Sequence, residues 1–350
     1  MFSLKFLPIV LLVGITCICN SAFSQADENT TASSQFSLFG REEPLKLELS
    51  FDIRRFIKRK YKDEYQNASL TVYLDDSTTV SDTIRIKARG EFRKGYCQFP
   101  PIKLNFKKAD FEIEDLKQLE KVKLVTTCRY QKAFQQYLFQ EYLIYKSYNL
   151  LSDKSFRVRL VHITYHDSQG KKKTFSQYGF LIEEVDRMAE RNACFEIENM
   201  GVSGRSCNPY ATTLMTTFQY MIGNTDYRIN NLHNVKLIRP SDPLKQIVYP
   251  VPYDFDYSGM VNTLYAIPHT DLGLESVRDR LYMGYCFTDD VYQQVFNQFQ
   301  QKKAEIYSLY ETYPFFDNRT RRASLSYLNS FYKILDNPLV SKRLIQDNCN

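Results

Sequence analysis

The sequence predicts an α+β fold in which a β-rich half precedes a helix-rich half. Alternating apolar and polar residues occur from about residue 69 to 108, and two later stretches carry apolar residues at helical spacing. From about residue 275 the pattern is mostly helical to the end. Runs of strands followed by runs of helices are typical of α+β proteins with two lobes, and a cleft between lobes is a natural ligand site.

The first residues predict export from the cytoplasm. Lys5 precedes an apolar run, and Ala22-Phe23-Ser24 is a small-x-small cleavage pattern. The run is shorter than the roughly 20 residues of a membrane-spanning helix. We therefore predict a signal peptide over residues 1–24, cleaved near Ser24, and a flexible polar leader over residues 25–45. No later segment is predicted to be transmembrane, so the mature protein is expected to be periplasmic or extracellular.

Charge and cysteine content add two expectations. Removal of Lys5 lowers the net charge from +6 to +5, spread along the chain, which does not favour nucleic acid as a partner. The densest basic run, residues 54–62, is interpreted as a solvated helix face. Six cysteines remain after cleavage, and an even number in an exported chain suggests disulfide bonds. Fifteen pairings exist for six cysteines; we expect pairing in sequence order, which joins Cys97 with Cys128, Cys194 with Cys207, and Cys286 with Cys349.

The β-rich half begins with a strand that runs into a short helix over residues 46–64. Alternation in SLTVYLDD and DTIRIKARGEF, continued by PPIKLNFKK, predicts an antiparallel sheet from about residue 69 to 108. KVKLVTTC, residues 121–128, is expected to form a further short strand.

The chain then changes period. Apolar residues in 130–151 lie close to one helical stripe, which predicts a helix. Two strands joined by the turn DSQGKKK follow within residues 156–185, and residues 211–224 form a second strong helical pattern. NVKLI and QIVYPVPYDFDYSG are predicted strands around a Pro-Ser-Asp turn.

Two polar segments carry the residues that chemistry needs. GNTDYRINNLHN, residues 223–234, follows the second helix, and PYDFDYSG, residues 252–259, follows a strand. A phosphoryl-transfer site needs a basic side chain on the phosphates, one aspartate for the acceptor hydroxyl, and a second aspartate with an asparagine for Mg²⁺. The chain offers these parts in order: Lys103, Asp226, an asparagine before a strand, and Asp254.

These segments also resemble a known family. YGFLIEEVDRMAERN is similar to the segment that closes the small lobe in CotH-type spore-coat kinases and to the linker of HipA-type kinases. RGEFRKGYCQFPPIKLNF is similar to their phosphate-binding lysine strand, and GNTDYRINNLHNVKLI with VPYDFDYSG resembles their catalytic and metal-binding loops. The resemblance covers about residues 69–260 and extends to uncharacterised secreted bacterial proteins of that type. It implies a two-lobed protein-kinase-like fold, with a β-rich N-lobe over residues 46–185 and a helical C-lobe over residues 186–350.

Within the N-lobe the resemblance implies the following nucleotide contacts. Lys103 takes the role of the sheet lysine on the phosphates, and Glu141 on the following helix pairs with it. Glu183 lies in the linker whose backbone meets the adenine. Arg89 and Arg93 flank a candidate phosphate loop in ARGEFRKG, which lacks a GxGxxG pattern.

Within the C-lobe the resemblance implies that Asp226 is the catalytic aspartate and Asp254 the metal ligand. Asp256 is a candidate second metal ligand, and His233 a phosphate or water contact. The metal asparagine is either Asn231, at the family's spacing of five residues, or Asn234, which stands directly before the strand VKLI. We favour Asn234 because a loop can absorb extra residues whereas the strand fixes geometry.

The function implied is that of a secreted atypical kinase-like protein. It would use ATP and Mg²⁺ or Mn²⁺ to transfer a phosphoryl group to a hydroxyl, with a protein as the expected substrate. Two alternatives stay open: a catalytically inactive binding or envelope-structural protein, and a metal-dependent hydrolase. Each candidate residue also has a structural explanation, since aspartate and asparagine are common in turns and lysine on solvent-facing strand positions.

Overall fold

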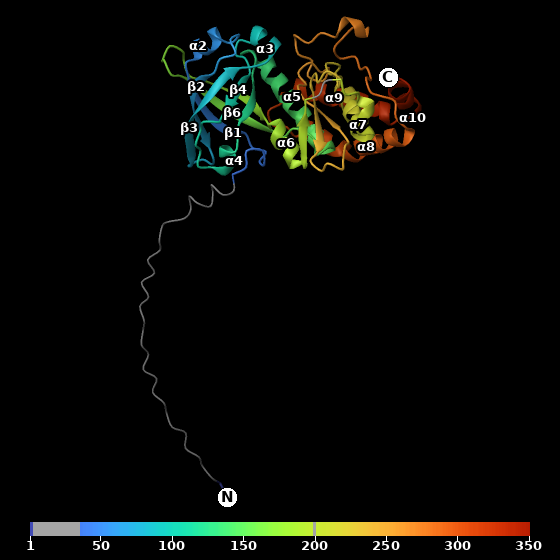
Figure 1. Ribbon diagram of the computed structural model, residues 1–350, viewed down its shortest axis with the longest axis horizontal. Coiled ribbons are helices and arrows are strands. Elements are labelled where there is room, and N and C mark those ends of the chain that lie inside the picture. The colour runs from blue at the N-terminus through green and yellow to red at the C-terminus, as the bar shows by residue number, and fades with distance from the viewer. Residues whose placement is uncertain (3–35, 199–200) are drawn as a thin grey trace.

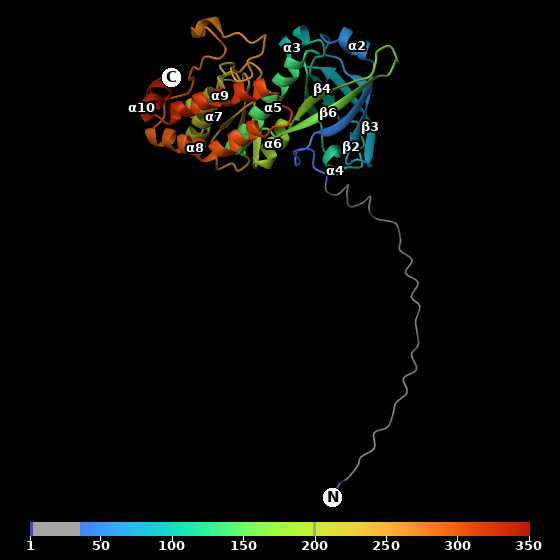
Figure 2. The ribbon, with the colours of Figure 1, turned by 180° about the vertical axis from the view of Figure 1, so that it is seen from behind.

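A seven-stranded barrel and a helical half make up the protein. The computed structural model describes residues 1–2, 36–198 and 201–350, so the predicted signal peptide, its cleavage site near Ser24 and most of the leader lie outside the described residues. In both ribbon views the barrel lies on one side, the helical half on the other, and the helix α5 between them (Figures 1 and 2).

The barrel closes because its first strand pairs with a strand far along the chain. The barrel order is β1-β2-β3-β4-β5-β7-β6, and β1 pairs with β6 in parallel while the other described pairs are antiparallel. Its strands are β1 (Leu45–Phe51), β2 (Gln66–Tyr73), β3 (Thr79–Ala88), β4 (Ile102–Asn105), β5 (Lys121–Thr126), β6 (Val158–Asp167) and β7 (Phe175–Ile182). Closure leaves no open sheet edge.

Alternation along each strand gives the barrel two different faces. Side chains such as Ile86, Leu104 and Leu124 fill its interior, where they are buried together. The outer face of β5, β6 and β7 carries Val125 and Phe180, which belong instead to the core of the helical half. The same strands therefore fill the barrel with their inward side chains and pack against the helical half with their outward side chains.

The helical half is built on two buried helices and a small sheet. Its three-stranded antiparallel sheet has the order β10-β9-β8. The strands are β8 (Cys194–Ile197), β9 (Val235–Pro240) and β10 (Tyr249–Pro252). The main helices of the chain are α5 (Lys132–Leu151), α6 (Val185–Arg191), α7 (Pro209–Ile222), α8 (Asp289–Glu311), α9 (Asn318–Leu335) and α10 (Pro338–Ser341). Three short helices belong to the barrel half: α2 (Ile53–Lys58), α3 (Glu91–Tyr96) and α4 (Glu114–Lys117).

The prediction of a two-lobed protein-kinase-like fold is wrong. The strands assigned to an N-lobe form a closed mixed barrel, because β1 adds to β6 over seven residue pairs from Leu45 to Phe51. Alternation predicted the strands, including the antiparallel set from residue 69 to 108, but alternation does not say which strands pair. The α3 helix inside that set also escaped prediction.

Two of the three expected disulfides are present. Cys97 bonds Cys128 and Cys286 bonds Cys349, as pairing in sequence order predicted. The expected Cys194–Cys207 bond is wrong, since both thiols are free and buried. The two side chains pack in different hydrophobic clusters, one in the main core and one beside α7, so sequence neighbours were not spatial partners.

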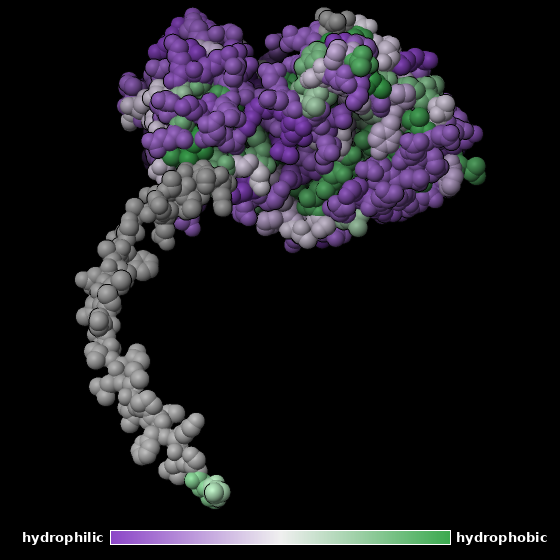
Figure 3. Space-filling model, turned by 60° about the horizontal axis from the view of Figure 1, so that its bottom comes forward, coloured by the Kyte–Doolittle hydropathy of each residue, from purple (hydrophilic) through white to green (hydrophobic). Residues whose placement is uncertain are grey.

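The surface is mostly hydrophilic on the face seen from below, with hydrophobic patches over the helical half (Figure 3). In the described part of the chain, no helix combines the length and the apolar character needed to cross a bilayer.

Candidate metal centre

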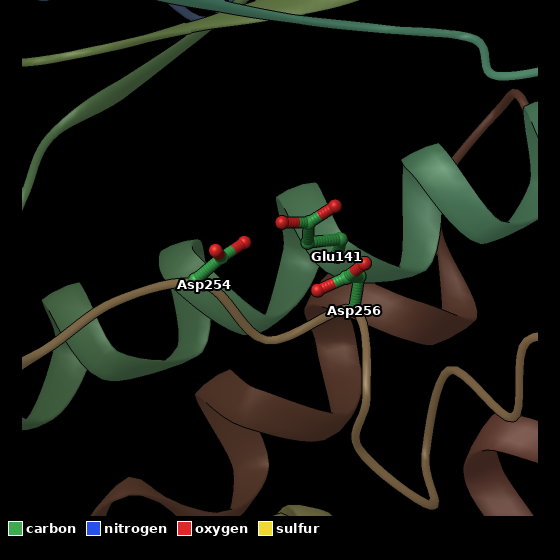
Figure 4. Close-up of side chains that lie close together, drawn as sticks. All are labelled: Glu141, Asp254 and Asp256. Atoms are coloured by element: carbon green, nitrogen blue, oxygen red, sulfur yellow. The ribbon is translucent and has the colours of Figure 1, made fainter. Parts of the chain in front are cut away.

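Three carboxylates meet where α5 passes the segment after β10. Glu141 lies in the middle of α5, and Asp254 and Asp256 come two and four residues after β10. One oxygen from each lies within 4.8 Å of the other two. Figure 4 shows the carboxyl groups gathered between the helix and the loop that runs alongside it. Residues more than a hundred positions apart in sequence thus form one acidic cluster.

Local backbone geometry explains why both aspartates point the same way. Asp254 has φ of 65°, a left-handed conformation that aspartate tolerates better than most residues. Its N–H donates to the Tyr145 hydroxyl at 2.8 Å, which ties the loop to α5 one turn beyond Glu141. Phe255 is fully buried against Tyr145, with ring centroids 4.7 Å apart. The alternation Asp-Phe-Asp therefore anchors the ring in the core and leaves both carboxylates beside Glu141.

A barrel residue, Arg93 on α3, provides the positive charge of the cluster. Its guanidinium lies 2.9 Å from Glu141 Oε2 and 2.7 Å from Asp256 Oδ2. Tyr265 also donates from its hydroxyl to Asp256 Oδ2 at 2.7 Å. Burial opposes the charge of Arg93, but Asp256 and then Glu141 outweigh it and raise its pKa. Three carboxylates against one guanidinium still leave the cluster short of positive charge.

Glu141 is the carboxylate of the cluster with an unsatisfied oxygen. The residue is 2% exposed, and its Oε1 has no hydrogen-bond partner among the described residues. Burial raises the pKa of Glu141, with Arg93 opposing and Asp256 adding to the rise. Burial likewise raises the pKa of Asp256 despite Arg93. A buried carboxylate oxygen without a partner is costly, and a cation would satisfy it.

The donor set fits a hard divalent cation. Carboxylate oxygens are the protein ligands that Mg²⁺ prefers, and at a metal–oxygen distance of about 2.1 Å opposite ligands lie about 4.2 Å apart. The three oxygens all lie within 4.8 Å of one another, a limit slightly above that separation. Glu141, Asp254 and Asp256 could therefore hold the ion, while Arg93 contacts two of the three carboxylates and balances one negative charge.

Basic side chains from the barrel face this cluster. Lys123 on β5 lies opposite Lys103 on β4, which lies opposite Lys87 on β3, so the three form a row on the outer face of the barrel. Burial lowers the pKa of Lys123 to about 7; Arg89 adds to the decrease and Asp254 opposes it. Lys123 therefore interacts electrostatically with both Arg89 and Asp254, whereas Arg93 is the cation in direct contact with the cluster.

Lys103, the predicted sheet lysine, stands one strand further from the cluster. Burial lowers its pKa, followed by Lys121 and Lys87, and Asp63 is the carboxylate that opposes the decrease. The partner of Glu141 is Arg93 and not Lys103. Sequence reasoning missed Lys123, because alternation places a lysine outward on both strands and does not say which strand borders the helical half.

The loop after α7 forms a second polar group. Asp226 Oδ1 lies 2.8 Å from His233 Nε2, and Asn234 Nδ2 donates to Asp226 Oδ2 at 3.0 Å and to its carbonyl at 2.8 Å. Asn234 has φ of 53°, and its carbonyl accepts from the N–H of Tyr253 at 3.0 Å. Asn234 therefore links Asp226 to the residue that precedes Asp254.

Asn231 and Glu183 have other contacts. Asn231 is exposed, and its Oδ1 accepts from the N–H of His233 at 3.2 Å in a local turn. Glu183 lies where the chain passes from β7 to α6, and its predicted role at the adenine stays a prediction. Its carboxylate accepts from Arg191 at 2.9 Å and from the N–H of Arg157 at 3.0 Å, and these bonds stabilise the connection between β7 and α6.

Arg93, predicted to flank a phosphate loop, instead joins the acidic cluster, and Tyr265 completes it without a clear signal in the sequence. Arg93 is one of several basic residues in RGEFRKG, and Tyr265 lies in an irregular segment. The disulfide from Cys97, directly after α3, to Cys128 is a local signal that α3 is held in place. In comparisons with known proteins, no family model and no curated protein matches the chain.

Proposed function

We propose that this protein is a metal-dependent phosphotransferase that moves a phosphoryl group from ATP to a hydroxyl of a protein substrate. The observation that carries the proposal is the closeness of opposite charges: Glu141, Asp254 and Asp256 gather where α5 passes the segment after β10, and Lys123 of the barrel has a pKa that burial, Arg89 and Asp254 all affect. A polyphosphate with its cation needs both halves of such an arrangement.

Each group has a task in the proposed transfer. Asp254, Asp256 and Glu141 hold Mg²⁺ or Mn²⁺, which when bound neutralises charge on the phosphates. Lys123 and Arg89 bind phosphate oxygens, and Lys103 adds positive charge behind them. Burial of Lys123 beside other cations lowers its pKa, and an arriving anion would restore its charge.

Asp226 is the proposed acceptor of the hydroxyl proton. The oxygen of the hydroxyl forms a bond to the γ-phosphorus, the bond from that phosphorus to the β–γ bridging oxygen breaks, and ADP leaves. His233 and Asn234 each contact one carboxylate oxygen of Asp226 and so fix its orientation. The resemblance to CotH-type kinases supports the same residue roles for Asp226 and Asp254. The proposal does not include a kinase-like arrangement of lobes.

The site of action proposed is outside the cytoplasm, in the periplasm or the extracellular space. Two disulfides in the described residues support it, because such bonds persist in oxidising compartments. Export would follow from cleavage of the predicted signal peptide near Ser24.

A second candidate is a binding protein without catalytic activity. The double ion pair of Arg93 favours it, since a guanidinium that already contacts Glu141 and Asp256 could give the cluster a purely structural role. The two candidates differ in whether a divalent cation binds.

The test is an assay of the purified, disulfide-bonded mature protein with ATP labelled at the α or the γ phosphate, with Mg²⁺ or Mn²⁺. We expect γ-label on protein, a cation-dependent rise in melting temperature with nucleotide, and loss of both in Asp254→Asn. Asp347→Asn, an exposed aspartate, is the matched control. Absence of label transfer together with absence of any nucleotide or cation effect on melting rules out the phosphotransferase; transfer of α-label would reassign it to nucleotidyl transfer.

A further inference from the structure

One end of the barrel carries a dense group of cations that the proposed active site does not use. Seven exposed basic residues lie on α2, the turn after it and the β6–β7 turn: Arg54, Arg55, Lys58, Lys62, Lys171, Lys172 and Lys173. Among the described residues none of the seven forms an ion pair, whereas their neighbour Arg59 pairs with Glu64 at 2.9 Å. Unpaired like charges at close range repel one another, so a partner of opposite charge would stabilise the group.

A single carboxylate holds the two basic segments side by side. Asp167, the last residue of β6, accepts from the N–H of Ile53 at 3.1 Å, and so fastens the start of α2. Its other oxygen accepts from the N–H groups of Lys171 at 2.6 Å and Lys172 at 3.0 Å, and so shapes the turn. The cations are therefore positioned by fixed backbone and do not depend on chance proximity of long side chains.

The two segments border a groove with two parts. One part, about 550 Å³, is lined by basic side chains from α2 and the turn, with Asp52 at its edge. The adjoining part, about 480 Å³, shares Arg54 and Lys58 with the first. Asp52 is occupied as the cap of α2, where Oδ1 accepts from the N–H of Arg55 at 2.8 Å. The first part of the groove is therefore lined almost entirely by positively charged side chains.

The second part has an apolar floor. Ile57, Phe99, Phe175 and Tyr130 line it, and the aromatic rings contact one another: the Phe99 and Phe175 centroids lie 5.5 Å apart, and those of Tyr130 and Phe175 6.2 Å apart. Tyr130 is 71% exposed, so its ring is available to a ligand. Aromatic side chains on a basic rim suit a ligand that carries both negative charge and apolar side chains.

We infer that this groove binds an acidic peptide segment with one or more apolar side chains. Carboxylates along the segment would meet the cations of α2 and the β6–β7 turn, and an apolar side chain would rest on Tyr130 and Phe175. A flat anionic membrane would reach the rim cations but not the floor, and an anionic polysaccharide has no apolar side chain to place there. The inference does not depend on the proposed phosphotransferase activity.

The experiment is fluorescence anisotropy with a labelled glutamate-rich peptide that contains two phenylalanines, titrated with the mature protein at low and at physiological salt. We expect binding that weakens as salt rises, because exposed charges are screened. The triple variant Lys171→Glu, Lys172→Glu, Lys173→Glu is expected to bind about tenfold more weakly or worse. Melting temperatures check that each variant is folded.

The matched control is Lys108→Glu, Lys333→Glu, Lys342→Glu, which makes the same charge change at exposed lysines elsewhere. Tyr130→Ala should weaken binding of the phenylalanine-containing peptide and leave a peptide with glycine in those positions unaffected. Equal losses in both triple variants would overturn the inference, because net charge alone would then explain binding. Binding of sulfated oligosaccharides or anionic vesicles in place of the peptide would overturn it as well.

Discussion

The buried acidic cluster and the Asp226 loop use carboxylates in opposite ways. Glu141 and Asp256 are buried beside Arg93, Asp254 next to them is half-buried, and Glu141 Oε1 has no partner among the described residues. Asp226 is more accessible, and both of its oxygens are satisfied by neutral or titratable side chains, those of His233 and Asn234. Under the proposed function, this difference would let the cluster hold a cation and Asp226 accept a substrate proton.

Replacing Asp254 should produce the largest effect. Asp254→Asn removes one of three charged ligands, so we expect loss of the cation-induced rise in melting temperature and a decrease in phosphoryl transfer of about 10³-fold or more, since a bound metal supplies several kcal/mol of charge stabilisation. Calorimetric Mn²⁺ titration and γ-label transfer measure the two effects. If the variant bound Mn²⁺ with unchanged affinity, the three carboxylates would not be the metal site.

Arg93 tests whether the cluster is held by charge balance. Arg93→Met leaves Glu141 and Asp256 buried without their guanidinium, and removal of one partner of a buried ion pair costs about 3–5 kcal/mol. The loss in free energy of unfolding, measured with urea, should be smaller at pH 5 than at pH 8, because protonation relieves the unpaired carboxylates. Mg²⁺ should restore part of it.

Arg55→Met is the control for that variant, because Arg55 is exposed and makes no ion pair among the described residues. Its free energy of unfolding should change little. Equal stability of the Arg93 variant and this control would mean that the charges of the cluster are not coupled.

Asp226 should separate chemistry from binding. Asp226→Asn removes the proton acceptor and leaves the three cluster carboxylates intact, so we expect transfer to fall by about 10²-fold while the cation-induced melting shift persists. If this variant also lost cation binding, Asp226 would belong to the same metal site as Glu141, Asp254 and Asp256.

Lys123 should give an effect on stability that depends on pH. Its pKa of about 7 in the folded protein lies below the ordinary lysine value of 10.5. Between these values the unfolded chain binds more protons, so this group makes stability rise as pH increases from about 7 toward 10. Lys123→Met should therefore stabilise the protein most at pH 6 and progressively less above pH 7, while reducing the melting shift caused by ATP.

Lys121→Met, two residues earlier on the same strand and exposed, is the control for Lys123. It should alter neither the pH dependence of unfolding nor the ATP effect. If both variants behave alike, Lys123 does not face the cluster in solution.

Patterns in the sequence predicted most of the individual elements. Alternation predicted the strands that became β2, β3 and β4, and helical spacing predicted the buried helices α5 and α7. The polar loops predicted Asp226, Asn234 and Asp254 as candidates, and these residues do lie at connected positions. Such features depend on local periodicity and turn chemistry, which short stretches of sequence carry by themselves.

Tertiary structure decided what those elements do together. Pairing of β1 with β6 closes a barrel where open lobes were expected, and it joins strands more than a hundred residues apart. Arg93, not Lys103, pairs with Glu141, and Lys123 lies nearer to Asp254. Strand order and the approach of distant charges depend on which surfaces pack together, and a local pattern of apolar and polar residues is the same for every such arrangement.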